Sequence, residues 1–335
     1  MRSAKNPADR PSRRAPLVSV RAPLVPLAGP CVVLHLFAGP AREGDIEYHM
    51  NRLGKANGCW VHTISLDICR DPSHDLLDDN LFGQLRQWCF SGKIFGFIAG
   101  FPCNTVSRAR FRPGGPPPLR SRTNIFGLPG LEGKHLVACD RGSELFVRTL
   151  DLAYGVTKAG GRVLLENPAD PGPPFPSFWK SSPFNRMRRS CGWMVVTGDQ
   201  CMLGGPTRKR TSLATNIENM DAFNKLKCCH KVHVKLIGYD SCQRKFATQI
   251  LSQYPSAMCE FISRRLFASW LSFGSGLSSV DFVPDPFLGQ KGFTRTGRVR
   301  HPLPRPLHVW PTTSCRRVLA EPPDGGIAST ISYCP

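Results

Sequence analysis

The sequence lacks an uninterrupted apolar run long enough to cross a membrane. Its longest candidate, Ala22–Ala41, is broken by Pro26, Pro30 and His35, whereas a membrane-spanning helix needs about 20 consecutive apolar residues. We therefore expect no membrane partner. The N-terminal part also lacks the continuous apolar core of a secretory signal peptide. We expect an intracellular protein, in the nucleus if the source is eukaryotic and otherwise in the cytoplasm.

Acidic residues are scarce relative to basic ones. The 335-residue chain carries 24 Asp and Glu against 44 Lys and Arg, and its net charge is +20. Residues 1–30 and 272–335 contribute +5 and +3, which leaves +12 for residues 31–271. The central part is therefore basic in its own right and favours polyanions, of which nucleic acid is the most common. The alternative explanation is a positive charge contributed by the tails, or a generic basicity that serves no particular partner.

The two ends of the chain show no periodicity of a packed element. Residues 1–30 are rich in Pro, Arg and Ala, and residues 272–335 are rich in Pro, Gly and Ser. We expect both to be disordered tails flanking one domain at 31–271, and we expect a monomer. The 14 cysteines are scattered through a chain that can form a large core, which is typical of reduced thiols rather than of a disulfide scaffold.

Short apolar runs alternate with stretches of helical spacing between these tails. The runs end in Gly, Pro or an acidic residue, which is typical of buried strands. The alternation predicts an α/β fold with a doubly wound, mostly parallel sheet. Strands are expected at 31–37, 60–66, 94–99, 163–166, 193–196 and 212–214, and helices at 43–55, 143–159 and 249–271.

Residues able to carry chemistry follow the predicted strands, where ligands bind in open α/β sheets. Gly39, in a turn after the first strand, would let a ligand approach the backbone. Asp67, after the second strand, is placed to accept hydrogen bonds from ribose hydroxyls. Cys103 follows Pro102 after the third strand as a candidate nucleophile, and Glu166 ends the fourth. Taken singly, each has a structural explanation as a tight turn, a buried thiol or a strand-end cap.

The order of these residues resembles that of the DNA cytosine-5 methyltransferase family over about residues 31–265. Pro-Cys followed by Glu-Asn at consecutive strand ends is the most specific part of the resemblance. The motifs that resemble those of the family are Leu36-Phe-Ala-Gly39 for the cofactor, Asp67 and Asp75-Leu76 for the second and third motifs, Phe101-Pro-Cys103 for the nucleophile, Leu165-Glu-Asn-Pro168 for the target base, and the basic segment Gly204–Thr211.

The resemblance implies a Rossmann-like, S-adenosyl-L-methionine-dependent enzyme that methylates C5 of cytosine in DNA. Cys103 would add to C6 of the base while Glu166 holds or protonates N3, and a target in a duplex would have to be flipped out of the stack. The resemblance assigns cofactor binding to Phe37, Gly39, Asp67 and Asp75.

Two arginine-rich segments are the predicted contacts with nucleic acid. The loop from Arg108 to Arg122 lies where members of the family place a loop over DNA, although a solvated surface loop is the alternative. The second segment, at 204–211, resembles the one that supports the target site. The predicted contact residues are Arg108, Arg110, Arg112, Arg208, Lys209 and Arg210.

Three features depart from the family pattern. His35 and Ala41 stand where the first motif has an acid and a second glycine. Lys209 and Thr211 take the usual arginine positions of the basic segment. The insert at about 215–245 is much shorter than a typical target-recognition domain, and in this respect the chain is similar to short members from phages or mobile elements.

The short insert contains thiols and imidazoles. Cys228-Cys229-His230 is followed by His233 and then by Cys242, and such groups could hold zinc. However, the segment has no CxxC pair, and adjacent cysteines cannot easily bind one tetrahedral ion. We therefore predict no metal site here. Phosphate contact is the better use of this segment, which carries lysines at 225, 227, 231 and 235.

Several alternatives remain open at this stage. RNA is a possible substrate, because nothing in the sequence reads the base or the sugar. A non-catalytic nucleic-acid-binding relic of the same fold is favoured by His35 and Ala41, and it is opposed by the joint presence of Cys103 and Glu166. An amino-group methyltransferase would need Asn/Asp-Pro-Pro-aromatic after the strand at 94–99, where Phe-Pro-Cys-Asn stands instead.

Overall fold

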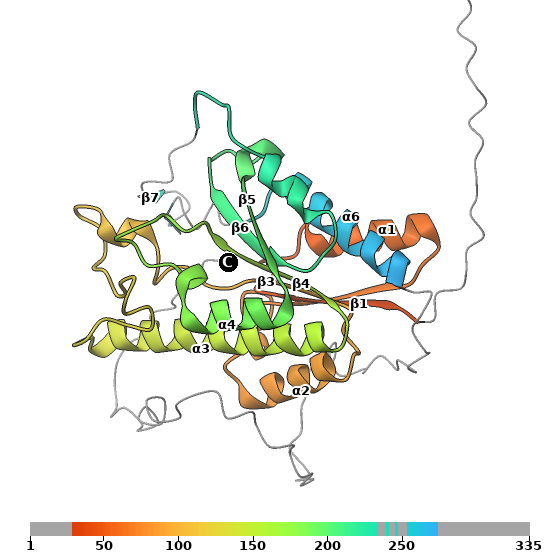
Figure 1. The fold of residues 1–335 in the computed structure, drawn as a ribbon, viewed down its shortest axis with the longest axis horizontal. Helices are drawn as coiled ribbons and strands as arrows, with labels where there is room; N and C mark the ends of the chain where they lie inside the picture. Colours follow the sequence, from red (N-terminus) through yellow and green to blue (C-terminus); the bar gives the residue numbers. More distant parts are fainter. Residues whose placement is uncertain (1–28, 234–238, 241–244, 247–252, 274–335) are drawn as a thin grey trace, which may run out of the picture.

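The computed structural model describes residues 29–233, 239–240, 245–246 and 253–273. Except for their innermost residues, the predicted tails at 1–30 and 272–335 lie outside the described residues, as does part of the insert at 215–245. The described part folds into a mixed β-sheet with helices on both faces (Figure 1). The predicted α/β fold is therefore confirmed.

Six strands form the main sheet in the order β2-β1-β3-β4-β6-β5. The first four run parallel, whereas β6 is antiparallel to both of its neighbours, so the sheet is mixed. A separate pair joins β7 (Tyr239–Asp240) to β8 (Lys245–Phe246). The strands of the main sheet are β1 (Cys31–Leu36), β2 (Val61–Leu66), β3 (Gly96–Gly100), β4 (Arg162–Pro168), β5 (Met194–Asp199) and β6 (Arg210–Thr215).

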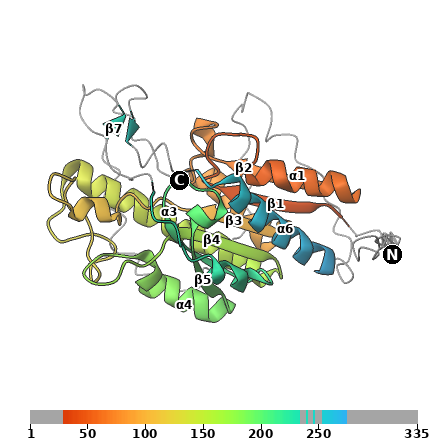
Figure 2. The ribbon, with the colours of Figure 1, turned by 90° about the horizontal axis from the view of Figure 1, so that it is seen from above.

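Helices cover the sheet on two sides, as Figures 1 and 2 show. On one side, α1 packs beside α6, and on the other α3 packs between α2 and α4. Every residue of β1 is buried, as expected of a parallel strand covered on both faces. Val32 and Leu34 enter one core and Cys31 and Val33 the other. The helices are α1 (Ile46–Asn57), α2 (Asp79–Phe90), α3 (Gly133–Lys158), α4 (Ser182–Cys191) and α6 (Ser256–Phe273).

The predicted elements differ from the structure mainly among the helices. The helix expected at 143–159 begins ten residues earlier, at Gly133, and the helices α2 and α4 are not predicted at all. The first helix begins at Ile46 because the Asp45 side chain caps it by accepting a hydrogen bond from the backbone N–H of Tyr48 at 2.8 Å. It ends at Gly58, whose φ of 64° suits a residue without a Cβ.

The strand order creates a place for a ligand between β1 and β3. After β1 the chain moves outward to β2 and then returns past β1 to β3. From β3 the chain moves the other way, to β4, and the helices that follow β1 and β3 lie on opposite faces. At such a switch point the connections leave in opposite directions and open a crevice at the carboxyl ends of the strands. Of the helices in the described ranges, none is long and apolar enough to span a membrane.

Candidate active site

The carboxyl ends of β3 and β4 bring together the Pro-Cys and Glu-Asn motifs. In the sheet Gly100 stands opposite Glu166, and Cys103 follows Gly100 by three residues. The Asn167 side chain donates a hydrogen bond to the backbone oxygen of Phe101 at 2.8 Å. This bond ties the two strand ends to each other just before Pro102 and Cys103.

Glu166 is a buried carboxyl group with one free oxygen. Its residue is only 2% exposed. Oε2 accepts a hydrogen bond from the Tyr254 hydroxyl at 3.0 Å, whereas Oε1 has no hydrogen-bond partner in the described part of the chain. An unpartnered buried carboxyl oxygen is costly in a folded protein. It is therefore a candidate for contact with a ligand.

Tyr254 is a site residue that the sequence patterns do not indicate. Burial, followed by the nearby Glu166 carboxylate and with Cys103 contributing, raises the pKa of this phenol well above its usual value. The hydroxyl therefore stays protonated and acts as a hydrogen-bond donor. Gly100 makes this contact possible, because a Cβ at that position would overlap the hydroxyl.

The basic segment at 204–211 reaches this site through Lys209. The ammonium group of Lys209 lies 5.8 Å from the centre of the Tyr254 ring, which is within the range of a cation–π contact. Arg208 and Arg210, which flank it, are exposed. Arg208 is also drawn toward the Asp199 carboxylate, with 3.6 Å between Nε and Oδ2. Of the three residues predicted to bind nucleic acid in this segment, Lys209 is the one whose contact with Tyr254 brings it to the site.

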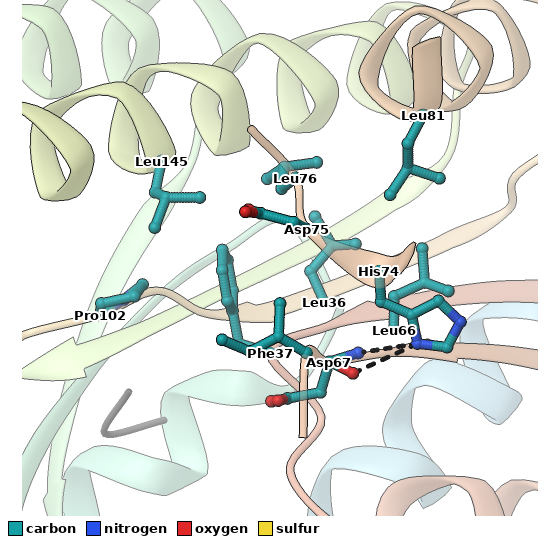
Figure 3. A pocket seen from close by; sticks show the side chains of 11 residues that line it. Leu36, Phe37, Leu66, Asp67, His74, Asp75, Leu76, Leu81, Pro102 and Leu145 are labelled. Atoms are coloured by element: carbon teal, nitrogen blue, oxygen red, sulfur yellow. Dashed lines mark hydrogen bonds between the residues drawn. The ribbon is translucent and has the colours of Figure 1, made fainter. Parts of the chain in front are cut away.

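A pocket of about 490 Å³, including its open mouth, lies beside this site (Figure 3). Figure 3 shows Phe37 and Pro102 on one side of it and Leu145 of α3 on another. Pro102 precedes Cys103, so the pocket adjoins the candidate nucleophile. The wall is largely apolar, with two carboxyl groups and a histidine, and its residues are Leu36, Phe37, Leu66, Asp67, Ile68, His74, Asp75, Leu76, Leu81, Pro102 and Leu145.

The loop after β1 has an unusual backbone. Phe37 has a φ of 56°, a left-handed conformation that is unfavourable for a bulky residue. Gly39 also has a positive φ, and a Cβ there would meet nothing within 4 Å, so its surroundings are open. Its N–H donates to Asp67 at 2.9 Å, and its carbonyl accepts from Arg70 at 2.6 Å. The loop is therefore held to the end of β2.

Three of the four predicted cofactor residues, Phe37, Asp67 and Asp75, lie in the pocket wall, whereas Gly39 is not part of it. Each carboxylate already has partners: Asp67 accepts hydrogen bonds from Gly39 and from Cys69 at 2.8 Å, and Asp75 accepts from the N–H of Leu77 at 3.0 Å and from Arg141 at 3.3 Å. A carboxylate has about four acceptor sites. Both side chains can therefore accept further hydrogen bonds from a ligand.

His35 stands where the family has an acid, and it is buried in β1. Burial, reinforced by the positive charge of Arg70, lowers the pKa of His35 to about 4. The imidazole is therefore neutral at physiological pH. A neutral imidazole cannot supply the negative charge that an acidic residue would carry at this position.

This lowered pKa predicts a loss of stability in mild acid. The unfolded chain takes up a proton at His35 below about pH 6.5, whereas the folded protein does so only near pH 4. The stabilising contribution is thus complete above pH 6.5 and falls as the pH drops toward 4, by about 2 kcal/mol at pH 5. Urea unfolding at pH 7.5 and pH 5 should show His35→Gln losing less stability than the wild type. Equal losses in both proteins would contradict this role.

The predicted arginine loop is largely fastened to the body of the protein. Arg120 is fully buried and donates to Thr105 and to the carbonyls of Ile125 and Cys139. Arg122 forms a two-pronged ion pair with Asp170. These two arginines cannot turn toward nucleic acid without breaking these contacts.

The three arginines predicted to contact nucleic acid from this loop differ in their surroundings. Arg110 donates to the carbonyls of Asn104 at 2.7 Å and Pro117 at 2.9 Å, so it shapes the loop. Arg108 is exposed and lies over the Phe175 ring at 4.9 Å, and Arg112 is also exposed. Arg108 and Arg112 are therefore the better placed for a phosphate.

A second cluster of reactive side chains lies at the carboxyl end of β5. The thiols of Cys201 and Cys228 gather there with the imidazoles of His230 and His233. The segment around Cys228 has no CxxC pair, and the sequence therefore predicts no metal site there. Cys201, which joins the cluster, is distant from that segment in sequence. Cys242, the other thiol considered, lies outside the described residues.

Comparison with known proteins does not identify the chain. No protein-family model matches it, and no curated protein sequence matches it. A functional proposal therefore depends on the residues and contacts described above.

Proposed function

We propose that the protein is a Rossmann-like, S-adenosyl-L-methionine-dependent methyltransferase that transfers a methyl group to C5 of cytosine in DNA. The observation that carries this proposal is the buried carboxyl group of Glu166, whose free oxygen lies in the same small region as Cys103 and Tyr254. A thiol and a carboxyl group at neighbouring strand ends are the two groups this reaction needs, and their order resembles that of the cytosine-5 family.

The residues of the pocket fit the cofactor. Its wall is largely apolar, as is usual for small-molecule sites, and suits a flat adenine ring. Asp67 and Asp75 retain acceptor sites for ribose hydroxyls or an amino group, and Gly39, which has space where a Cβ would stand, is hydrogen-bonded to Asp67 of the pocket wall. When bound, S-adenosyl-L-methionine supplies an electrophilic methyl group. Because Pro102 lines the pocket, that group would be delivered beside Cys103.

The chemistry on cytosine follows from the two strand-end groups. The Cys103 thiolate adds to C6 and forms a carbon–sulfur bond, and Glu166 holds or protonates N3 so that negative charge does not accumulate on the ring. Tyr254 occupies the second carboxyl oxygen of Glu166, which leaves Oε1 for the base. After C5 has taken the methyl group, the C5 proton is lost to water, the C5–C6 double bond re-forms as the bond from C6 to sulfur breaks, the Cys103 thiolate leaves, and any proton given to N3 returns to Glu166.

The basic charge of the chain supports a nucleic-acid substrate. The central residues carry a large positive excess, and Arg108, Arg112 and Arg210 are exposed on segments that lead to or from the site. Phosphate contacts position a nucleic acid without reading its sequence. DNA is proposed on the resemblance to the cytosine-5 family, and RNA is the alternative substrate that the experiment must test.

The direct test is methyl transfer to nucleic acid. The full chain is incubated with S-adenosyl-L-methionine labelled in the methyl group and with DNA or RNA, and the modified nucleosides are then separated. We expect label in 5-methyl-2′-deoxycytidine. Label only in 5-methylcytidine would reassign the substrate to RNA. No label in either, from a protein that binds the cofactor, would favour the non-catalytic relic.

Cofactor binding should raise the melting temperature of the protein. A ligand that binds only the folded state stabilises it by about 2.7 kcal/mol at a concentration 100 times its Kd. S-Adenosyl-L-methionine should therefore shift the thermal unfolding curve upward, and Asp75→Ala should reduce the shift, because one acceptor in the pocket wall is lost. Asp151→Ala, which removes a carboxyl group of α3 that is paired with Arg86 of α2 and lies outside the pocket wall, is the matched control. An equal shift in all three proteins would place the cofactor elsewhere.

Binding to DNA should weaken steeply with salt. The slope of log K against log salt is about −0.9 for each neutralised phosphate of a duplex. The double variant Arg108→Ala/Arg112→Ala should therefore have a slope shallower by up to about 1.8. Arg186→Ala/Arg189→Ala removes the same charge from the exposed face of α4 and should leave the slope unchanged. If the Arg186→Ala/Arg189→Ala variant had the shallower slope and the Arg108→Ala/Arg112→Ala variant the slope of the wild type, the DNA would bind on the α4 side.

A further inference from the structure

Four side chains with metal-binding atoms converge at the carboxyl end of β5, and none of them lines the pocket of the proposed methyltransferase. Cys201 lies in the 3-10 helix Gln200–Leu203, directly after β5. Cys228, His230 and His233 come from the segment that follows the 3-10 helix Met220–Lys225. One ligand atom from each residue can be chosen so that all four lie within 4.8 Å of one another.

The distances within this cluster suit a tetrahedral zinc ion. The Cys228 sulfur lies 3.1 Å from Nε2 of His233 and 3.6 Å from Nδ1 of His230. Ligands at 2.0–2.3 Å from zinc stand about 3.3–3.8 Å apart at the corners of a tetrahedron. The cluster therefore needs only small side-chain adjustments to close around an ion. Two thiolates and two imidazoles are also a donor set that zinc prefers.

The backbone around the cluster is fixed by hydrogen bonds that do not use the ligand side chains. The N–H of Asp199 donates to the carbonyl of Leu226 at 2.8 Å, and the buried Asp199 carboxylate accepts from the N–H of Cys228 at 2.8 Å. Cys201 is itself only 7% exposed. These bonds hold the segment carrying Cys228 against the end of β5, which places Cys201 as the remote fourth ligand.

The adjacent cysteines do not compete for the same ion. Cys228 belongs to the cluster, whereas its neighbour Cys229 is exposed and is not part of it. The geometric objection to two adjacent cysteine ligands therefore does not apply.

We propose that Cys201, Cys228, His230 and His233 bind one zinc ion. With four protein ligands the site has no open position, so the ion is structural rather than catalytic. Binding releases the protons of the two thiols, and the two thiolate charges balance the charge of the ion. The zinc fastens the segment that carries the exposed Lys227 and Lys231 to the end of β5, and it does so independently of the methyl-transfer chemistry.

Metal content of the full chain tests the proposal. The protein, purified in zinc-containing buffer and desalted, should carry about one zinc ion per chain by inductively coupled plasma mass spectrometry. Cys201→Ser, Cys228→Ser and His233→Ala should each weaken zinc binding by more than about a hundredfold, since even an outer partner of a ligand can contribute 10–100-fold. Cys229→Ser, one residue away, is the matched control and should keep the zinc.

Cobalt binding gives a second measurement that does not need the variants to fold. The wild-type chain is stripped with a chelator and loaded with Co²⁺ alone. We expect the absorption bands of tetrahedral cobalt together with a sulfur-to-cobalt charge-transfer band. Subsequent Zn²⁺ should displace the cobalt and bleach these bands.

Three results would overturn the assignment. The first is a zinc-exposed wild type without zinc and without the cobalt spectrum. The second is retention of zinc by Cys201→Ser but not by Cys228→Ser, which would mean that another group is the fourth ligand. The third is a disulfide between Cys201 and Cys228 in protein purified under reducing conditions, detected by mass spectrometry of peptides. None of these results depends on methyltransferase activity. The zinc site can therefore be refuted without refuting the proposed function, and the proposed function without refuting the zinc site.

Discussion

Cys103→Ser is expected to abolish methyl transfer while leaving cofactor binding nearly intact. In the proposed reaction the Cys103 sulfur forms the only covalent bond between protein and base, and a serine hydroxyl is a far weaker nucleophile at neutral pH than a thiolate. Transfer of labelled methyl groups to DNA measures the first effect. The thermal shift caused by S-adenosyl-L-methionine measures the second.

Trapping on modified DNA makes this prediction specific to one thiol. With 5-fluorocytosine at the target position, fluorine cannot leave as the proton does, so the wild type should stay covalently attached to the DNA. Cys103→Ser should not be trapped. Cys59→Ser, at the opposite end of the sheet before β2, should behave as the wild type. An adduct mapped to another cysteine, or full activity of Cys103→Ser, would refute the role given to Cys103.

Glu166→Gln is expected to lower the rate of methyl transfer by about 10²–10⁴-fold, the range usual for loss of a general acid or base. The amide can still accept the hydrogen bond that Tyr254 donates to Glu166, so the local packing should survive. Its NH₂ group can contact N3 of cytosine, but it cannot transfer a proton to it. Single-turnover kinetics with labelled cofactor would measure the change.

Two further variants separate chemistry from structure at this position. Tyr254→Phe removes the hydroxyl that orients Glu166 and should lower the rate less than Glu166→Gln does, because the carboxyl group remains. Glu260→Gln, which changes a half-buried carboxyl group of α6 paired with Arg264 and Arg52, should leave the rate unchanged. If Glu166→Gln were as active as Glu260→Gln, the carboxyl group would not take part in the reaction.

The strand-end residues can be predicted from the sequence because they depend on local patterns. Apolar runs closed by Gly, Pro or an acid locate the strands, and the parallel sheet then brings the ends of β3 and β4 together. This places Cys103 near Glu166 without any knowledge of contacts. The helix α2 escapes the same reasoning because only Leu85 and Cys89 of its residues are fully buried, so its apolar face is weak.

The residues that the sequence does not predict depend on contacts between distant segments. Tyr254 reaches Glu166 from a position 88 residues away, and Cys201 joins a cluster whose other members begin at Cys228. Arg120 illustrates the opposite problem. In a Pro- and Arg-rich loop it is expected to face solvent or nucleic acid, but it is buried because the hydroxyls of Thr105 and Ser143 and the carbonyls of Ile125 and Cys139 accept hydrogen bonds from its guanidinium.

The space left by the missing side chain of Gly100 has a consequence for synthesis of the protein. The Tyr254 hydroxyl fills that space and completes the surroundings of Glu166. While a nascent chain is still shorter than 254 residues, β3 and β4 can pair but the carboxyl group lacks its donor. The candidate active site is therefore complete only when the segment before α6 has left the ribosome, so a prematurely terminated chain would contain both Cys103 and Glu166 and still have an incomplete site.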